Sequence, residues 1–308
     1  MSERYLWFFS RRTRSHSATA EAMSDVPGNM HWLSQANSSN NLANLFRDEL
    51  SGVPIVVQSI NTNWSDQASL ERMQAALIDS IEEKKTKLSK FLNVELISKL
   101  STIDWNRLKN DDYLNYRAIN SGPNLGYLID AANHARAARW MRKFAVKAVL
   151  LDETIVYKLH RRVFACERHE LLRAGIYRSK ALSIIIKQGE RGKSRFTWPE
   201  PAKIPALMED FGAWLREAPP GPVSAFEAHL RLVAIRPFDD GNGRVARLLM
   251  NLLLIRGGYP PVPMLRENRK TYIDSLIHYA LTSNPTPFRV HLYQRLEETL
   301  GEYLSILQ

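Results

Sequence analysis

The chain has 308 residues, of which 44% are hydrophobic and 24% are charged, and its formal net charge is +10. This composition can bury a sizeable core in one large domain or two modest ones. No apolar run approaches the roughly 20 residues needed to cross a bilayer, and the single cysteine, Cys166, cannot form an internal disulfide. We therefore expect a globular cytoplasmic protein with no membrane partner.

The positive charge calls for an anionic partner, such as nucleotide phosphates, an acidic protein or nucleic acid. The excess is spread along the chain, and its one dense cluster, Arg11-Arg12-Arg14, lies in a segment poor in periodic hydrophobic residues. Clusters of this kind are usually solvated tails. We therefore do not expect nucleic acid to be the partner.

The N-terminal part of the chain divides into two segments. Residues 1–65 are rich in Ser, Asn and small polar residues, and we predict a mostly irregular or partly disordered segment with at most a short helix near 42–50. From Gln67 onward apolar residues recur every three or four positions, and Ser65-Asp66 supplies a helix cap. Residues 66–123 are predicted to form a helical extension.

The remainder, residues 124–308, is expected to form the main domain. Helical patterns cover 93–100 in the extension and 124–149 and 152–165 in the main domain, the last opening with Asp152 as its N-cap. The predicted fold class is mainly α.

One segment departs from the helical period. Residues 181–186 are apolar and rich in β-branched side chains, residues 188–192 are typical of a turn, and residues 194–198 can return as a second strand. We predict a β-hairpin over 181–198. A lone hairpin is only marginally stable, so it must pack on helices or await a partner.

The most informative stretch begins at Arg236 and ends at Arg247. Gly241 and Gly243 allow the backbone to turn with positive φ and approach a ligand closely, so the N–H groups of Gly241, Asn242 and Gly243 can hold a phosphate where a helix begins. The apolar run that follows predicts a buried central helix, which Gly257-Gly258 ends. The helix dipole then adds to phosphate binding.

Charged side chains complete this phosphate-binding loop. Arg244 and Arg247 are three residues apart, and therefore on one helical face, where their planar guanidinium groups match phosphate oxygens. Asp240 offers a hard oxygen ligand suited to Mg²⁺. Together these roles indicate a nucleoside triphosphate.

This stretch resembles the signature of the Fic family: His, any residue, Phe, any residue, Asp or Glu, Gly, Asn, Gly or Lys, Arg, two free residues, Arg. Arg236 stands where the family has His. The resemblance extends over about residues 124–295 and implies a Fic-type helical bundle with a β-hairpin flap before the central helix. The matching positions are Phe238, Asp240, Gly241, Asn242, Gly243, Arg244 and Arg247.

The resemblance implies transfer of AMP from ATP, with Mg²⁺, to a hydroxyl side chain of a target protein held on the 181–198 hairpin. It assigns ATP binding to Gly241, Asn242, Gly243, Arg244 and Arg247, the metal to Asp240, and catalytic positions to Arg236, Asn242 and Arg244.

In the family the histidine is the general base. Arg236 cannot replace it, because a guanidinium stays protonated and offers no acceptor. We expect turnover to fall by roughly 10²- to 10⁴-fold while nucleotide binding persists. The alternatives are a non-catalytic nucleotide- or partner-binding pseudoenzyme and a transferase that uses a different phosphate-containing donor.

Other residues are poor substitutes for the base. His229 lies seven residues before Arg236, about 10 Å away along a helix, and is interpreted as a core residue, as is the half-buried His160. Asp239 occupies a free position of the signature and is expected to face solvent or to neutralise Arg236. The family's inhibitory helix has its nearest counterpart at residues 121–126, with Leu125 in place of glutamate.

Overall fold

The computed structural model describes residue 64 and residues 66–91, 125–164, 174–188, 192–264 and 268–305. The helices predicted near 42–50 and at 93–100, and the basic cluster near the N-terminus, lie outside these residues. The mainly α prediction is confirmed. The described elements are α3 (Gln67–Phe91), α6 (Leu125–Ala145), α7 (Glu153–Val163), β1 (Ser183–Gln188), β2 (Gly192–Thr197), the 3₁₀ helix η5 (Pro201–Lys203), α8 (Ile204–Glu217), α9 (Pro222–Ile235), α10 (Asn242–Arg256), α11 (Arg269–Thr282) and α12 (Thr286–Ser305).

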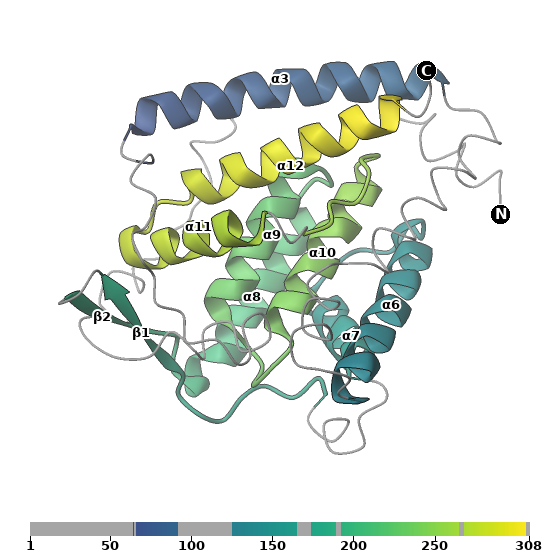
Figure 1. Ribbon diagram of the computed structural model, residues 1–308. Coiled ribbons are helices and arrows are strands. Elements are labelled where there is room, and N and C mark those ends of the chain that lie inside the picture. Colours follow the sequence, from purple (N-terminus) through teal and green to yellow (C-terminus); the bar gives the residue numbers. More distant parts are fainter. Residues whose placement is uncertain are drawn as a thin grey trace.

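Helix α10 is the centre of the bundle (Figure 1). It contacts α6, α7 and α9, and every residue from Asn242 to Leu254 is buried. A helix covered on all sides must be apolar nearly all round, as the sequence predicts for this segment. Gly258 ends it with a φ of 79°.

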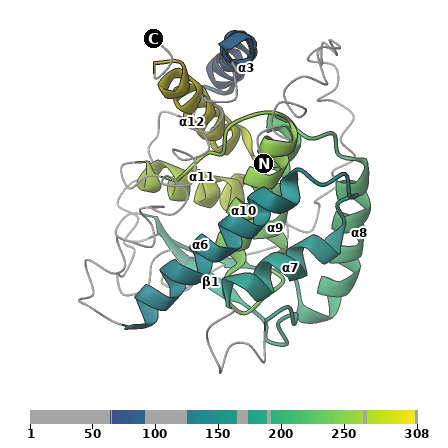
Figure 2. The same cartoon turned by 90° about the vertical axis from the view of Figure 1, so that its right-hand side faces the viewer.

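Helices α6 and α7 lie side by side on one face of the molecule (Figure 2). The Asp152 side chain accepts a hydrogen bond from the N–H of Thr154 at 2.9 Å, so the predicted N-cap of α7 is confirmed. Helix α6 ends at Ala145, before the predicted 149. Beyond it, Arg256 donates hydrogen bonds to the carbonyls of Lys147 and Val149, which holds this loop against the end of α10.

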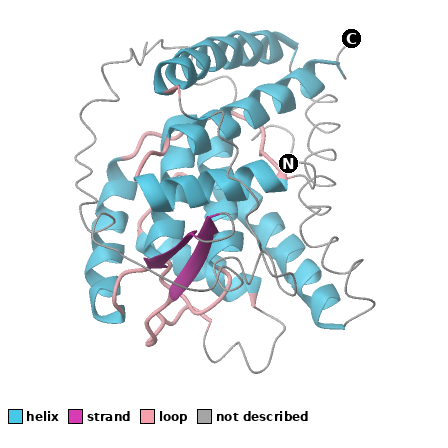
Figure 3. Cartoon of the chain, turned by 60° about the vertical axis from the view of Figure 1, so that its left-hand side comes forward, coloured by secondary structure: helices cyan, strands magenta, loops and turns pink. Residues whose placement is uncertain are grey.

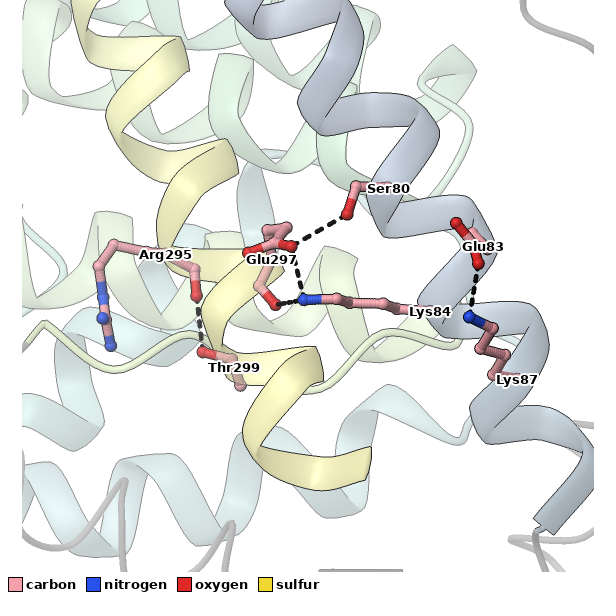
Figure 4. Close-up of polar contacts among 7 residues, drawn as sticks. All are labelled: Ser80, Glu83, Lys84, Lys87, Arg295, Glu297 and Thr299. Carbon is pink, nitrogen blue, oxygen red and sulfur yellow. Dashed lines mark hydrogen bonds and ion pairs between the residues drawn. The ribbon is translucent and has the colours of Figure 1, made fainter. Parts of the chain in front are cut away.

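Helix α3 packs along α12, far from it in sequence (Figure 4). The Nζ of Lys84 lies 2.5 Å from Oε1 of Glu297, and the Ser80 hydroxyl donates to the same oxygen at 2.9 Å. On the apolar stripe of α3, Ile81 and Leu88 are buried. Asp66 caps the helix by accepting from the N–H of Ser69 at 3.0 Å, as predicted.

The predicted hairpin is confirmed: β1 and β2 pair antiparallel, with Ser183 opposite Thr197 (Figure 3). It packs on the helices through Trp198, which is buried and donates from its indole nitrogen to the carbonyl of Val233 on α9 at 3.2 Å. Thus the hairpin does not depend on its own two strands for stability.

Among the described residues, no helix combines the length and apolar character needed to cross a membrane.

Candidate functional site

The site begins where α9 ends. Arg236 is the C-cap of α9, with φ 48° and ψ 64°, and its N–H donates to the carbonyl of Leu232 at 2.9 Å. This left-handed conformation costs an L-residue about 1 kcal/mol, and Pro237 then prevents the helix from continuing. The Arg236 side chain is buried, with its guanidinium carbon 4.8 Å from the centre of the Trp198 ring at the base of the hairpin.

The loop between α9 and α10 is closed by Asn242. Its side-chain oxygen accepts from the N–H of Phe238 at 3.0 Å, and its side-chain nitrogen donates to the Phe238 carbonyl at 2.9 Å. Asn242 is completely buried. Because both ends of this amide serve the loop, any contribution of Asn242 to ligand binding comes from its main-chain N–H or from the loop shape that it maintains.

Gly241 occupies the sharp turn into α10. Its φ of 77° is in the left-handed region, and a Cβ at this position would lie 2.6 Å from Cε2 of Phe164. Glycine is therefore required here for both conformation and space. Helix α10 starts at the next residue, so the first-turn N–H groups of Asn242 and Gly243, which have no acceptor within a helix, face the loop side of the helix end.

The two arginines of the helix lie together. Arg244 and Arg247 are both buried, and both lie close enough to His134 of α6 that, after burial itself, their charges lower its pKa, to about 3. Arg244 also lies over the Phe164 ring, 4.7 Å from its centre. The charges of both guanidinium groups therefore act on the same buried histidine.

Asp240 provides one accessible carboxylate beside this pair. One carboxylate oxygen accepts from the N–H of Gly241 at 2.7 Å, and the other lies 3.5 Å from Nη2 of Arg244. The side chain is 41% exposed. No group of three or more His, Cys, Asp or Glu residues in the described part of the chain could hold a metal. Asp240 thus fits Mg²⁺ as one ligand, with phosphates and water as the others, which is the coordination Mg²⁺ usually has in nucleotide sites.

His160 supports the loop, although its sequence context suggested only packing. The N–H of Gly175 donates to its Nδ1 at 2.9 Å, so the proton is on Nε2, which donates to the carbonyl of Asp240 at 3.0 Å. The ring stacks on Phe238 with centroids 3.7 Å apart. Burial first, and then the charge of Arg244, lower the pKa of His160 to about 3, so the ring is neutral.

His229 is a core residue, as predicted. It is completely buried on α9, and its Nε2 lies 3.0 Å from the hydroxyl of Tyr272. Burial, followed by the charge of Arg247, lowers its pKa to about 3. Asp239 is exposed at the surface of the loop, as expected.

Sequence reasoning missed Arg178, which joins the hairpin to this loop. It is 2% exposed, and its Nε donates to the carbonyl of Arg236 at 2.8 Å. Its position in the sequence, between the turn at Gly175 and the first strand, could have indicated this role. A long polar side chain that lies over the core at such a position needs hydrogen-bond acceptors.

Part of this sequence is similar to known proteins. Residues 150–254 match the model of the Fic/DOC family. The chain is 43% identical over 110 residues to Protein adenylyltransferase Fic of Aedes aegypti, which covers 34% of this chain and 22% of that protein. It is 34% identical over 163 residues to Protein adenylyltransferase Fic of Nematostella vectensis, covering 52% of this chain and 35% of that protein.

A solved structure of Fic-1 (residues 134–508) from C. elegans shares the fold, with a TM-score of 0.63 and 19% identity over 78% of this chain and 74% of that one. The chain thus spans between about a fifth and a third of the length of the two curated relatives. Residues 150–254 of this chain are therefore a segment of the Fic/DOC family, and the described part of the chain shares the helical fold of that solved structure.

Proposed function

We propose that this protein binds ATP and transfers AMP to a hydroxyl side chain of a target protein, with slow turnover because Arg236 replaces the general base. The observation that carries the proposal is the burial of Arg244 and Arg247 together behind the glycine turn that starts α10. The activity itself is the one named in the Aedes and Nematostella relatives.

The phosphates of ATP would lie at the N-terminus of α10. The main-chain N–H groups of Asn242 and Gly243 and the helix dipole favour an anion there. Gly241 provides the turn that exposes them, because its own N–H donates to Asp240. The guanidinium groups of Arg244 and Arg247 match the β- and γ-phosphate charge. Asp240 would hold Mg²⁺, which supplies charge neutralisation when bound. Such groups act by position and electrostatics, the effects that dominate phosphoryl-transfer catalysis.

The same geometry explains why turnover should be slow. Arg236 keeps its proton at any pH the protein meets, and its buried guanidinium lies over Trp198. The left-handed turn at residue 236 is a feature of the main chain, so we expect the loop to keep its shape with either arginine or histidine at this position. Nucleotide binding and proton transfer are therefore separable.

Among the residues that the structure describes, the histidines near the loop do not supply another base. His134, His160 and His229 are buried, and the pKa of each is about 3, far below the range in which a general base works near neutral pH. In His160 both ring nitrogens already have partners in the loop and the turn at Gly175.

The target protein would bind at the hairpin. In a two-stranded sheet of order β1-β2, each strand has an edge that the other does not pair, and an extended target segment can add there through main-chain hydrogen bonds. Because Trp198 and Arg178 connect the hairpin to α9 and to the loop, a segment bound on it would be presented to the phosphate site.

A second candidate is a non-catalytic nucleotide- or partner-binding protein, and the contact of Arg236 with Trp198 favours it. In such a protein Arg236 would hold the hairpin in place through Trp198, and the protein would catalyse no reaction. A third candidate is a transferase that uses the same site to bind a different phosphate-containing donor.

Calorimetric titration with a non-hydrolysable ATP analogue and Mg²⁺ tests the proposal. We expect binding by the unaltered chain, and Arg247→Met should weaken it at least about tenfold. Arg256→Met is the matched control: Arg256 is at the opposite end of α10, holding loop carbonyls, and its loss should change affinity by less than about threefold. No binding by the unaltered chain would refute the proposal, and preference for another nucleotide would favour a different donor.

A further inference from the structure

Each of the three guanidinium nitrogens of Arg178 donates to a main-chain carbonyl. Nη1 donates to Lys180 at 2.7 Å, Nη2 to Pro199 at 2.5 Å and Nε to Arg236 at 2.8 Å. The main-chain N–H of Arg178 donates to the carbonyl of Pro237 at 2.9 Å. Such a set of donors in fixed directions is specific to arginine, since lysine has only one nitrogen.

These carbonyls belong to three separate parts of the site. Lys180 leads into β1, Pro199 follows β2, and Arg236 occupies the position of the family's base. One buried side chain therefore connects both ends of the hairpin to the start of the phosphate-binding loop. A displacement of the hairpin relative to residue 236 must break at least one of these hydrogen bonds.

The surroundings of Arg178 disfavour its positive charge. Burial first, and then the neighbouring Arg236, lower its pKa, whereas Asp239 and Glu200 raise it. Two arginines close together in a buried region repel each other, and carbonyl oxygens aimed at the Arg178 guanidinium offset this. The arrangement also supports Arg236 in its left-handed conformation, since the Arg236 carbonyl is held at 2.8 Å.

We infer that Arg178 is a positioning residue that fixes the hairpin relative to residue 236, so that a segment bound on the hairpin meets the nucleotide in one register. The identity of the bound segment and of the nucleotide rests on the proposed function. The hydrogen bonds that join the hairpin to residue 236 do not depend on it. Arg178 acts through the main chain of Arg236 and the ends of the hairpin.

The test compares Arg178→Lys with Arg256→Lys. Arg256 also donates to two loop carbonyls, so the two variants lose the same kind of contact. Hydrogen–deuterium exchange is followed for the amides of residues 183–197. We expect exchange at least about tenfold faster in Arg178→Lys, because local opening becomes easier, and unchanged within about twofold in Arg256→Lys. Equal exchange in both variants would overturn the inference.

A second readout separates positioning from stability. In the Arg236→His background, adding Arg178→Lys should lower the labelling of protein with radioactive ATP at least about tenfold, with ATP affinity changed by less than about threefold. A parallel loss of affinity and labelling would show damage to the phosphate site and overturn the inference. If the unaltered chain fails to bind ATP, only the proposed function falls, because the exchange comparison needs no nucleotide.

Arg178→Gln provides a further variant in case lysine disturbs folding, since it keeps a donor and removes the charge. If both variants are unfolded while Arg256→Lys is folded, Arg178 is a folding residue and the inference is wrong.

Discussion

His160 and Asp240 are separated by 80 residues in the chain, and the imidazole of the first donates a hydrogen bond to the main-chain carbonyl of the second at 3.0 Å. The same ring accepts from the N–H of Gly175 and stacks on Phe238. The loop between α9 and α10, which we propose binds phosphate, therefore depends on α7 as well as on α10 for its shape.

Replacing His160 by alanine should weaken both the fold and nucleotide binding. Two buried hydrogen bonds and a ring stack are lost, so we expect about 2–4 kcal/mol less stability in urea unfolding and about tenfold weaker binding of an ATP analogue at a temperature where the variant is folded. His291→Ala is the control, because His291 is equally buried but lies on α12. Equal nucleotide affinity in the two variants would contradict this role for His160.

Stability should decline as the pH falls below about 6.5, the pKa of a histidine in an unfolded chain. The pKa values of His134, His160 and His229 are about 3 in the folded protein, so between these values the unfolded chain binds protons that the native protein does not. Each histidine should lower the unfolding free energy by up to about 1.4 kcal/mol per pH unit.

Urea unfolding at pH 7, 6 and 5 measures this decline. His229→Gln removes one of the three buried imidazoles, and the unfolding free energy of this variant should therefore depend less steeply on pH. Identical slopes for the variant and the unaltered chain would show that His229 does not contribute.

Gly241→Ala should be more destabilising than Gly258→Ala. Both glycines have positive φ, 77° and 79°, so both variants incur a backbone strain of about 1 kcal/mol. Only at Gly241 does the added Cβ meet an aromatic ring, 2.6 Å from Cε2 of Phe164, which adds about 1–3 kcal/mol. Thermal unfolding of both variants gives the difference, and Phe164→Leu should recover part of it. An equal loss of stability in the Gly241→Ala and Gly258→Ala variants would mean that the loop moves away from Phe164 at no cost, which would contradict this prediction.

Asp240→Asn should reduce the dependence of ATP affinity on Mg²⁺. Asparagine can still accept from the N–H of Gly241, but it removes the charge that favours the metal. Asp239→Asn is the neighbouring control, with an exposed carboxylate in the adjacent position. Titration of an ATP analogue at several Mg²⁺ concentrations should distinguish the two variants. The same Mg²⁺ dependence in both would remove Asp240 from the metal site.

Local patterns predicted much of this structure. The cap at Asp152 and the turn at Gly241 depend on the conformational preferences of one or two residues, and α10 depends on an apolar run that can only be buried. The hairpin likewise follows from β-branched residues on either side of turn residues. In each case the pattern that predicts the element lies within a few residues in the sequence.

Contacts between distant segments could not be predicted in this way. The hydrogen bond of Arg178 to Arg236 spans 58 residues. The place of Arg178 between a turn and a strand indicates at most that its side chain lies over the core, and does not indicate which carbonyls it meets. Asn242 shows the other limit: the signature specifies an asparagine there, but only the structure shows that its amide pairs with the main chain of Phe238. A motif specifies residue types but leaves the partner of each polar atom open.

The central claim is that the nucleotide site is intact and that only the proton acceptor is missing. Arg236→His tests it most directly, by incubation with radiolabelled ATP and Mg²⁺ in parallel with the unaltered chain and with titration of an ATP analogue. We predict at least about 10²-fold more label on the variant or its target, with affinity for the analogue changed by less than about threefold. Rapid labelling by the unaltered chain, or a variant that binds nucleotide and remains inert, would contradict the claim.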